Sequence, residues 1–180
     1  MKKTLTVVIA LVLVVVMSVA GTVAYLTAST GPVVNTFTVG NIDITLAESE
    51  NLNLKMVPGN DIAKDPKVTV VGGSEACWLF VKVEKSGNLD SFVSYTIDSG
   101  WTPLDGVSGV YYREVAASES NQEFAVLKDN KVTVKDTVTK AMMDALNAEG
   151  ATKPTLTFTA YAVQKDNIAD PVTAWNQFGS

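Results

Sequence analysis

The chain has 180 residues, with 14 basic and 19 acidic side chains, one cysteine and no histidine. The acidic balance disfavours nucleic-acid binding, because that affinity depends on basic side chains that meet phosphates. The absence of histidine excludes HExxH zinc peptidases, catalysis by histidine with serine or cysteine, and imidazole metal sites, while a lone cysteine excludes an intrachain disulfide.

The N-terminus has the layout of a secretion signal. Lys2 and Lys3 precede a neutral, strongly apolar stretch, and no further charge occurs before Asp43. The densest part, residues 4–20, falls short of a hydrocarbon core about 30 Å thick at about 1.5 Å per helical residue. A cleaved signal is therefore favoured, and a retained anchor that includes residues 21–26 is the alternative. In both cases the lysines stay inside and the remaining chain is exported.

Small residues suited to a signal peptidase stand at Thr22 and Ala24, which makes Tyr25 the first mature residue. We therefore expect a signal peptide at residues 1–24 and one domain at residues 25–180. The mature chain would have 180 − 24 = 156 residues. A chain of that length buries about 68–70% of its extended surface and needs no disulfide to stabilise its core.

Beyond the signal, short alternating segments rich in β-branched and aromatic residues are separated by Gly, Pro, Asn or Asp. This pattern predicts an antiparallel all-β domain. In residues 41–46 apolar side chains alternate with polar ones, and residues 52–56 repeat the pattern before a turn at Pro58 and Gly59.

The next clear strand covers residues 77–85 and directs four apolar side chains toward a core: Cys77, Leu79, Val81 and Val83. Its opposite face, which carries Trp78, Phe80, Lys82 and Glu84, is expected to be mixed and half exposed. Residues 126–134 have the form of a two-residue hairpin, because Asp129 and Asn130 tolerate the positive φ that such turns need.

Two helices are expected in the C-terminal part. One runs from about Val138 to Leu146, with Asp136 or Thr137 as its cap and Gly150 after its end. A strand follows at residues 155–163. A short terminal helix then begins at Asp170 and Pro171 and carries apolar side chains on one side: Val172, Trp175 and Phe178.

Residues 21–27 (Gly-Thr-Val-Ala-Tyr-Leu-Thr) and 35–46 resemble the start of the TasA/camelysin family. The likeness continues through residues 57–59, 64–66 and 77–84 and is weaker at 155–162. It implies a jelly-roll sandwich that is processed by a SipW-type signal peptidase and secreted to the cell surface. In the best-known member it also implies polymerisation into biofilm matrix fibres, in which the N-terminal segment of one subunit completes the sheet of its neighbour. The present chain is shorter than that member and has no long lysine-rich, acidic tail.

The composition of residues 25–39 supports strand donation independently of the resemblance, because these residues are uncharged and become free at one end after cleavage. A detached, apolar, strand-prone arm is suited to pair with an exposed sheet edge. The alternative is that the arm forms the first strand of its own domain. The residues that would carry the pairing are Tyr25, Leu26, Val33, Val34, Phe37 and Val39.

The sequence and the resemblance together predict a structural protein of the cell surface or biofilm matrix. Its expected partners are further copies or related matrix subunits, with no catalytic residue, metal, cofactor or nucleic acid, and with membrane contact only through the uncleaved signal. The alternatives are a surface metallopeptidase, as camelysin-type relatives are described, and a monomeric module that binds carbohydrate or protein. An aromatic patch for such a module is available in Trp78, Phe80, Trp101, Tyr111 and Tyr112, although in a two-layer sandwich we prefer to interpret these residues as core or cross-strand pairs.

Three further features have structural interpretations that we prefer. Asp98-Ser99-Gly100 matches the signature of aspartic peptidases, but a single copy lacks the second carboxylate and is typical of a turn. Cys77 is expected to be buried in the core and not to be reactive. Several aspartates stand near turns without EF-hand spacing, and we interpret them as turn and surface residues: Asp61, Asp65, Asp90, Asp98 and Asp105.

Overall fold

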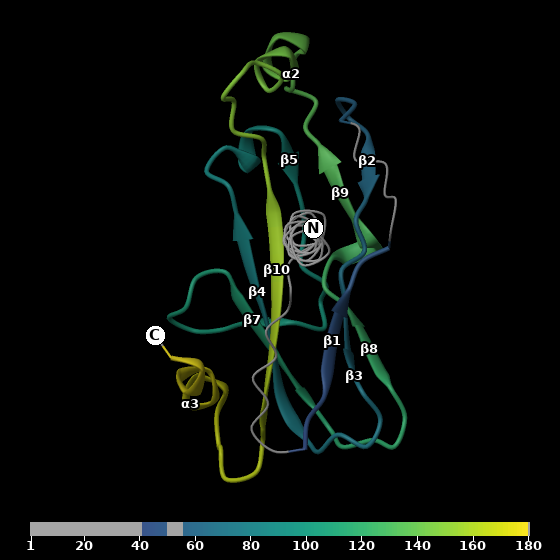
Figure 1. Cartoon of the computed structure of the whole chain (residues 1–180), viewed down its shortest axis with the longest axis vertical. Helices are drawn as coiled ribbons and strands as arrows, with labels where there is room; N and C mark the ends of the chain where they lie inside the picture. The colour runs from purple at the N-terminus through teal and green to yellow at the C-terminus, as the bar shows by residue number, and fades with distance from the viewer. Residues whose placement is uncertain (1–40, 50–55, 180) are drawn as a thin grey trace, which may run out of the picture. The chain divides into compact units, whose positions relative to one another are not determined.

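The computed structural model describes residues 41–49 and 56–179. All described residues belong to one compact unit of the chain. This unit consists mostly of β-strands in antiparallel sheets with few helices, which confirms the all-β prediction (Figure 1). The strands are β1 (Ile44–Ala47), β2 (Asp61–Ala63), β3 (Lys67–Val70), β4 (Cys77–Lys85), β5 (Val93–Ser94), β6 (Thr102–Pro103), β7 (Val110–Val115), β8 (Gln122–Ala125), β9 (Lys131–Val134) and β10 (Leu156–Gln164).

The described strands form three sheets, with the orders β1-β3-β8, β10-β4-β7-β6 and β2-β9-β5. The two three-stranded sheets are joined at a kink. There the amide of Lys64 donates to the carbonyl of Asn130 at 2.9 Å, and the amide of Val126 donates to the carbonyl of Pro66 at 2.9 Å. β2 with β3 and β9 with β8 therefore act as two long kinked strands, and together they form one layer that faces the four-stranded sheet.

This arrangement shows that the predicted hairpin at residues 126–134 is wrong. Asp129 and Asn130 do have positive φ, of 57° and 52°. However, β8 pairs with β3 and β9 pairs with β2, so the chain continues in one direction through these residues. Five residues, 126–130, stand opposite the three residues 64–66, and the positive φ values accommodate this bulge.

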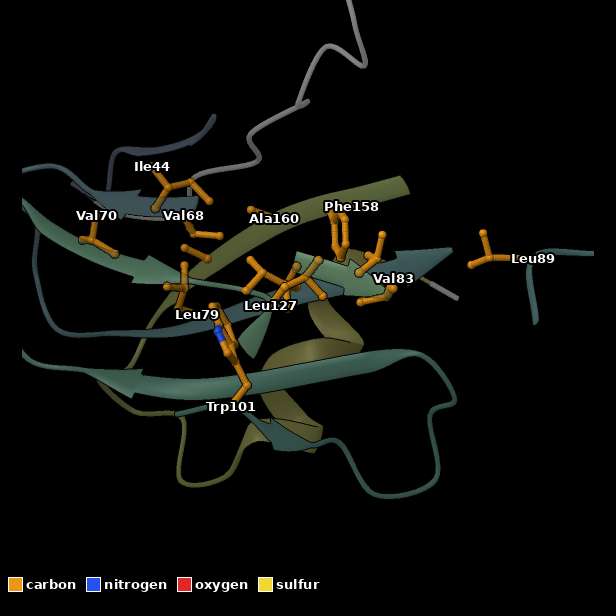
Figure 2. Close-up of a cluster of buried hydrophobic side chains, with 14 of the residues drawn as sticks. Ile44, Val68, Val70, Leu79, Val83, Leu89, Trp101, Leu127, Phe158 and Ala160 are labelled. Carbon is orange, nitrogen blue, oxygen red and sulfur yellow. The ribbon is translucent and has the colours of Figure 1, made fainter. Parts of the chain in front are cut away.

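The main core lies between the two layers and contains aliphatic side chains from both (Figure 2). β4 contributes Cys77, Leu79, Val81 and Val83, and its bounds and its inward face are as predicted. β3 contributes Val68 and Val70 from the opposite layer. The alternation of buried and exposed residues along β1 also follows the prediction.

The second face of β4 is mixed, as predicted, because the side chains of Lys82 and Glu84 are 38% and 56% exposed, whereas the two aromatic residues of this face are buried. Trp78 is 7% exposed and Phe80 is fully buried. They are covered by helix α3 (Pro171–Trp175) and the 3₁₀ turn η3 (Asn176–Phe178), which follow β10 at the end of the chain. The ring centres of Phe80 and Trp175 are 5.3 Å apart. A distant segment therefore covers the aromatic half of this face, and the half that carries Lys82 and Glu84 stays open to solvent.

Both predicted helices are present, but their details differ from the prediction. Helix α2 (Lys140–Ala145) is shorter than predicted, and its cap is Thr139, whose hydroxyl accepts from the amide of Met142 at 3.2 Å. Asp136 and Thr137 are therefore not the cap.

Helix α3 begins at Pro171 after the cap Asp170, as predicted. Its packed side chains are those of Ala174 and Trp175, while Val172 remains 39% exposed, so the predicted apolar side is wrong at that position.

Candidate functional site

The outer edge of β10 is the longest strand edge without a partner among the described residues. β10 has nine residues and is the terminal strand of the four-stranded sheet, paired only with β4. Beyond the two ends of this ladder, the amide of Ser86 donates to Thr155 and the amide of Lys165 donates to Ala76. Because pairing alternates along an antiparallel strand, the odd-numbered residues of β10 bond to β4.

The even-numbered residues of β10 consequently direct their amide and carbonyl groups away from β4. These are Leu156, Phe158, Ala160, Ala162 and Gln164. No described strand pairs with these groups. β1 lies beside β10, but its ladder partner is β3. The edge therefore offers a row of donors and acceptors for a further strand.

An apolar groove adjoins the first residues of this edge. It has a volume of about 360 Å³ and lies between the start of β10 and the sheet β2-β9-β5. Its apolar lining comes from Met56, Ile62, Leu89, Val93, Val132, Pro154 and Leu156. β2 is also a terminal strand of its sheet. A strand that paired with β10 would therefore have apolar side chains of this groove against one of its faces.

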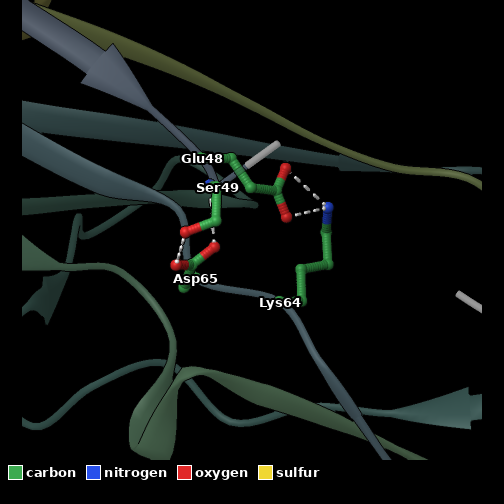
Figure 3. Close-up of polar contacts among 4 residues, drawn as sticks. All are labelled: Glu48, Ser49, Lys64 and Asp65. Carbon is green, nitrogen blue, oxygen red and sulfur yellow. Dashed lines mark hydrogen bonds and ion pairs between the residues drawn. The ribbon is translucent and has the colours of Figure 1, made fainter. Parts of the chain in front are cut away.

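The groove is bordered by a polar anchor that fixes the segment after β1 (Figure 3). The Nζ atom of Lys64 lies 2.9 and 3.1 Å from the two carboxylate oxygens of Glu48. The same Nζ atom is 5.5 Å from the ring centre of Phe158 on β10. The side chain of Lys64 is only 15% exposed, so this ion pair is less solvated than a typical surface pair.

The second half of the anchor joins Ser49 to Asp65. The hydroxyl and the amide of Ser49 donate to the two carboxylate oxygens of Asp65 at 2.5 and 3.0 Å. These bonds lower the pKa of Asp65, because they stabilise the ionised carboxylate. The anchor holds the end of β1 against the connection between β2 and β3, next to the groove.

Sequence reasoning did not identify this edge or the groove, because both depend on which strands become neighbours. The predicted site residues at the N-terminus lie outside the described residues. These are the cleavage positions Thr22, Ala24 and Tyr25 and the arm residues Leu26, Val33, Val34, Phe37 and Val39.

The aromatic residues proposed as one binding patch are divided between two faces of the four-stranded sheet. Trp78, Phe80 and Tyr112 pack together under the C-terminal segment. Trp101 and Tyr111 lie on the other face, against the main core. The core packing that we preferred for these aromatic residues is therefore confirmed, and they do not form the single patch of the alternative.

Cys77 is fully buried, as predicted, and burial raises the pKa of its thiol to about 11. Asp98 lies at a turn, where its carboxylate accepts from the amide of Gly100 at 2.9 Å. This is the structural role that we preferred for the Asp-Ser-Gly sequence.

Three of the remaining aspartates make local polar contacts. Asp61 forms an ion pair with Lys131 at 2.7 Å, and Asp90 forms one with Lys85 at 2.5 Å. Asp65 belongs to the anchor. Within residues 41–49 and 56–179, no group of three or more cysteine, aspartate or glutamate side chains is placed to hold a metal ion.

No helix in the described part of the chain is long and apolar enough to cross a bilayer. Comparison of the sequence and structure with protein-family models, with curated proteins and with solved structures finds no match.

Proposed function

We propose that this chain is an exported structural subunit of the cell surface or extracellular matrix, which associates with further copies of itself by strand addition. In this proposal, residues 1–24 are removed as a signal peptide by a SipW-type peptidase. The remaining chain folds as a jelly-roll-like sandwich, and its N-terminal arm supplies a strand to a neighbouring copy. Related matrix subunits are further partners of the same kind.

The observation that supports the proposal best is the outer edge of β10. A strand edge whose amides and carbonyls have no partner among the described strands favours pairing with another chain, and protein folds usually shorten, charge or cover such edges. β10 is nine residues long, and its side chains on the core face are those of Phe158, Ala160 and Ala162. None of these is charged, so the core face of this edge has no charge that would oppose an added strand.

The composition of the arm complements this edge. Residues 25–39 carry no charge, and as a strand Val33, Phe37 and Val39 would share one face. That face is suited to the apolar groove of Met56, Ile62, Val132 and Leu156. Backbone hydrogen bonds would then supply affinity, and the alternating apolar residues would set the register.

A proline substitution in β10 tests the proposal. Leu156→Pro removes one outward amide and leaves every bond to β4 in place, and proline is tolerated at edge positions whose amide does not face the neighbouring strand. The control is Leu156→Ala, which shortens the same side chain and keeps the amide. Both variants are made in the chain that begins at Tyr25.

We expect filaments or concentration-dependent oligomers of the unsubstituted chain in electron microscopy and sedimentation. One lost hydrogen bond of about 1 kcal/mol raises the concentration needed for assembly about fivefold for each contact, and proline also obstructs the approach of the added strand. Leu156→Pro should therefore assemble much less well than Leu156→Ala. Strand addition at this edge would be contradicted if the two variants assembled equally well. It would also be contradicted if a chain lacking residues 25–39 assembled as well as the unsubstituted chain.

A further inference from the structure

A second hollow, of about 550 Å³, lies between β5 with its following segment and strands β6 and β7. We call it the tyrosine cleft, because Tyr95 and Tyr111 line it together with Asp98, Ser99 and Trp101. Its volume falls within the range of pockets that hold small molecules. Neither the proposed assembly edge nor the arm uses this cleft.

The two tyrosines line the cleft, and their hydroxyl groups have no hydrogen-bond partner among the described residues. Both side chains are half-buried and pack against the main core. Each hydroxyl can donate and accept a hydrogen bond. A tyrosine in this state offers an apolar face and a polar tip to a ligand.

Further hydrogen-bonding groups surround the rings. One carboxylate oxygen of Asp98 accepts from Gly100, and the other has no partner within the described residues. The hydroxyl of Ser99 likewise donates to no described residue. The cleft therefore combines apolar ring faces with several donors and acceptors that are free to bind polar groups of a ligand.

The charges of the lining cancel. Lys85 and Lys135 stand against Asp90 and Asp98, two positive and two negative charges. Lys85 forms an ion pair with Asp90 at 2.5 Å, and Lys135 donates to the backbone carbonyl of Asp90. The side chains that line the cleft therefore have no net charge, although Arg113 lies behind them and interacts with Asp98, and such a lining favours a neutral ligand.

The back of the cleft is rigid. Trp101 is 5% exposed, and its indole N–H donates to the carbonyl of Ala125 at 2.8 Å. Arg113, the one arginine of the sequence, places its guanidinium 3.8 Å from the ring centre of Phe124 and 5.5 Å from that of Trp101. Because these groups hold the segment at residues 98–101 against the core, the tyrosine cleft is formed without a ligand.

We infer that the tyrosine cleft binds a neutral saccharide. The C–H face of a pyranose ring packs on the rings of Tyr95 and Tyr111, and the sugar hydroxyls bond to the tyrosine hydroxyls, Ser99 and Asp98. For an exported protein, such a site joins the subunit to polysaccharide, independently of how the subunits join each other.

The test measures binding of cellopentaose, maltopentaose and the β-1,4-linked pentamer of N-acetylglucosamine to the mature chain by calorimetry and saturation-transfer NMR. We expect millimolar or tighter binding of at least one of the three. Tyr111→Ala and Tyr95→Ala should each weaken it at least about tenfold, because each removes one stacking surface.

The matched control is Tyr112→Ala, which changes the neighbouring residue of β7 on the opposite face of the sheet, where Tyr112 meets Trp78. It should leave saccharide affinity unchanged. Tyr111→Phe, which keeps the ring and so preserves folding, should lose several-fold affinity through the missing hydroxyl alone. The inference would be overturned if none of the three saccharides bound, or if Tyr111→Ala and Tyr112→Ala lost the same amount of saccharide affinity. It would also be overturned if the saccharide bound at the outer edge of β10 and not in the cleft.

Discussion

The two faces of the β10-β4-β7-β6 sheet are closed in different ways. One face meets the kinked layer of β1, β2, β3, β5, β8 and β9 through aliphatic side chains. The other is closed by a short C-terminal segment through aromatic rings, with Phe80, Tyr161, Trp175 and Phe178 in mutual contact. The first face is closed by strands that also pair with one another, whereas the second depends on a single terminal segment.

This difference indicates that the two faces have separate tasks. The first face contains the main core, and residues that line the apolar groove and the tyrosine cleft belong to this core or pack against it. The second face is covered around Trp78 and Phe80, while Lys82 and Glu84 remain exposed. Because the cover is aromatic and local, we expect it to contribute stability without taking part in assembly or ligand binding.

Substitutions of two adjacent residues of β4, one on each face, test whether the side chains on both faces are tightly packed. Leu79 and Phe80 are both fully buried, one on each face. We expect Leu79→Ala and Phe80→Ala each to lower the free energy of unfolding by about 3–5 kcal/mol, because each leaves a cavity in packed surroundings. Urea denaturation of the two variants measures this. A cost below about 1 kcal/mol for Phe80→Ala would show that the second face is only loosely covered.

A change in the cover itself should have a smaller effect. Trp175 is partly buried, and its ring centre lies 5.2 Å from that of Tyr161 and 5.6 Å from that of Phe178. We expect Trp175→Ala to cost about 2 kcal/mol and to reduce the near-ultraviolet circular dichroism of the cluster. Val172→Ala, in the exposed part of the same helix, is the control and should stay within about 0.5 kcal/mol. Equal costs for the two variants would contradict the packing described.

Acid should weaken the cover through its helix cap. The amide and the hydroxyl of Thr173 donate to the carboxylate of Asp170 at 2.9 and 2.8 Å, and these bonds lower the pKa of Asp170. Since the unfolded chain then binds this proton more readily than the folded one, the stabilisation is present above the unfolded pKa of about 3.9. It is lost as the pH falls through the lower folded value.

The stability difference between the unsubstituted chain and Asp170→Ala should therefore shrink between pH 6 and the acid limit, as followed by urea titrations. A constant difference over that range would mean that the carboxylate charge does not stabilise the cap.

The smallest expected effect concerns the reactivity of Cys77, which lies on the first face. With a thiol pKa raised to about 11 by burial, about one molecule in a thousand carries a thiolate at pH 8, and the sulfur is also inaccessible. We expect iodoacetamide to modify Cys77 no faster than the protein unfolds. A cysteine introduced by Val172→Cys on the exposed side of α3 should react promptly in the same sample. Comparable rates at the two positions would contradict the burial of Cys77.

The sequence was informative wherever the cause of structure is local. β4 has the predicted bounds because Cys77, Leu79, Val81 and Val83 recur at every second position, and α3 begins where Asp170 and Pro171 together supply a cap and a first helical residue. Burial of Cys77 follows from the same alternation. These features depend on neighbours within a few residues along the chain.

Features that depend on distant partners were missed. Trp78 and Phe80 are buried because residues nearly one hundred positions later return to cover them, and no local pattern contains that information. Asp129 and Asn130 have the backbone conformation expected of a hairpin turn. However, the strands on either side of them, β8 and β9, pair with β3 and β2 and not with each other. The edge of β10 and both hollows likewise arise from which strands are adjacent.

The central claim is that the outer edge of β10 receives a strand from another copy, and amide hydrogen exchange of the mature chain tests it most directly. The account predicts that the outward amides of Phe158, Ala160 and Ala162 exchange faster than those of Thr157, Thr159 and Tyr161 in dilute monomer, and become equally protected in the assembled state. If the outward amides are already protected at every concentration, the arm closes the edge of its own domain and the claim is contradicted.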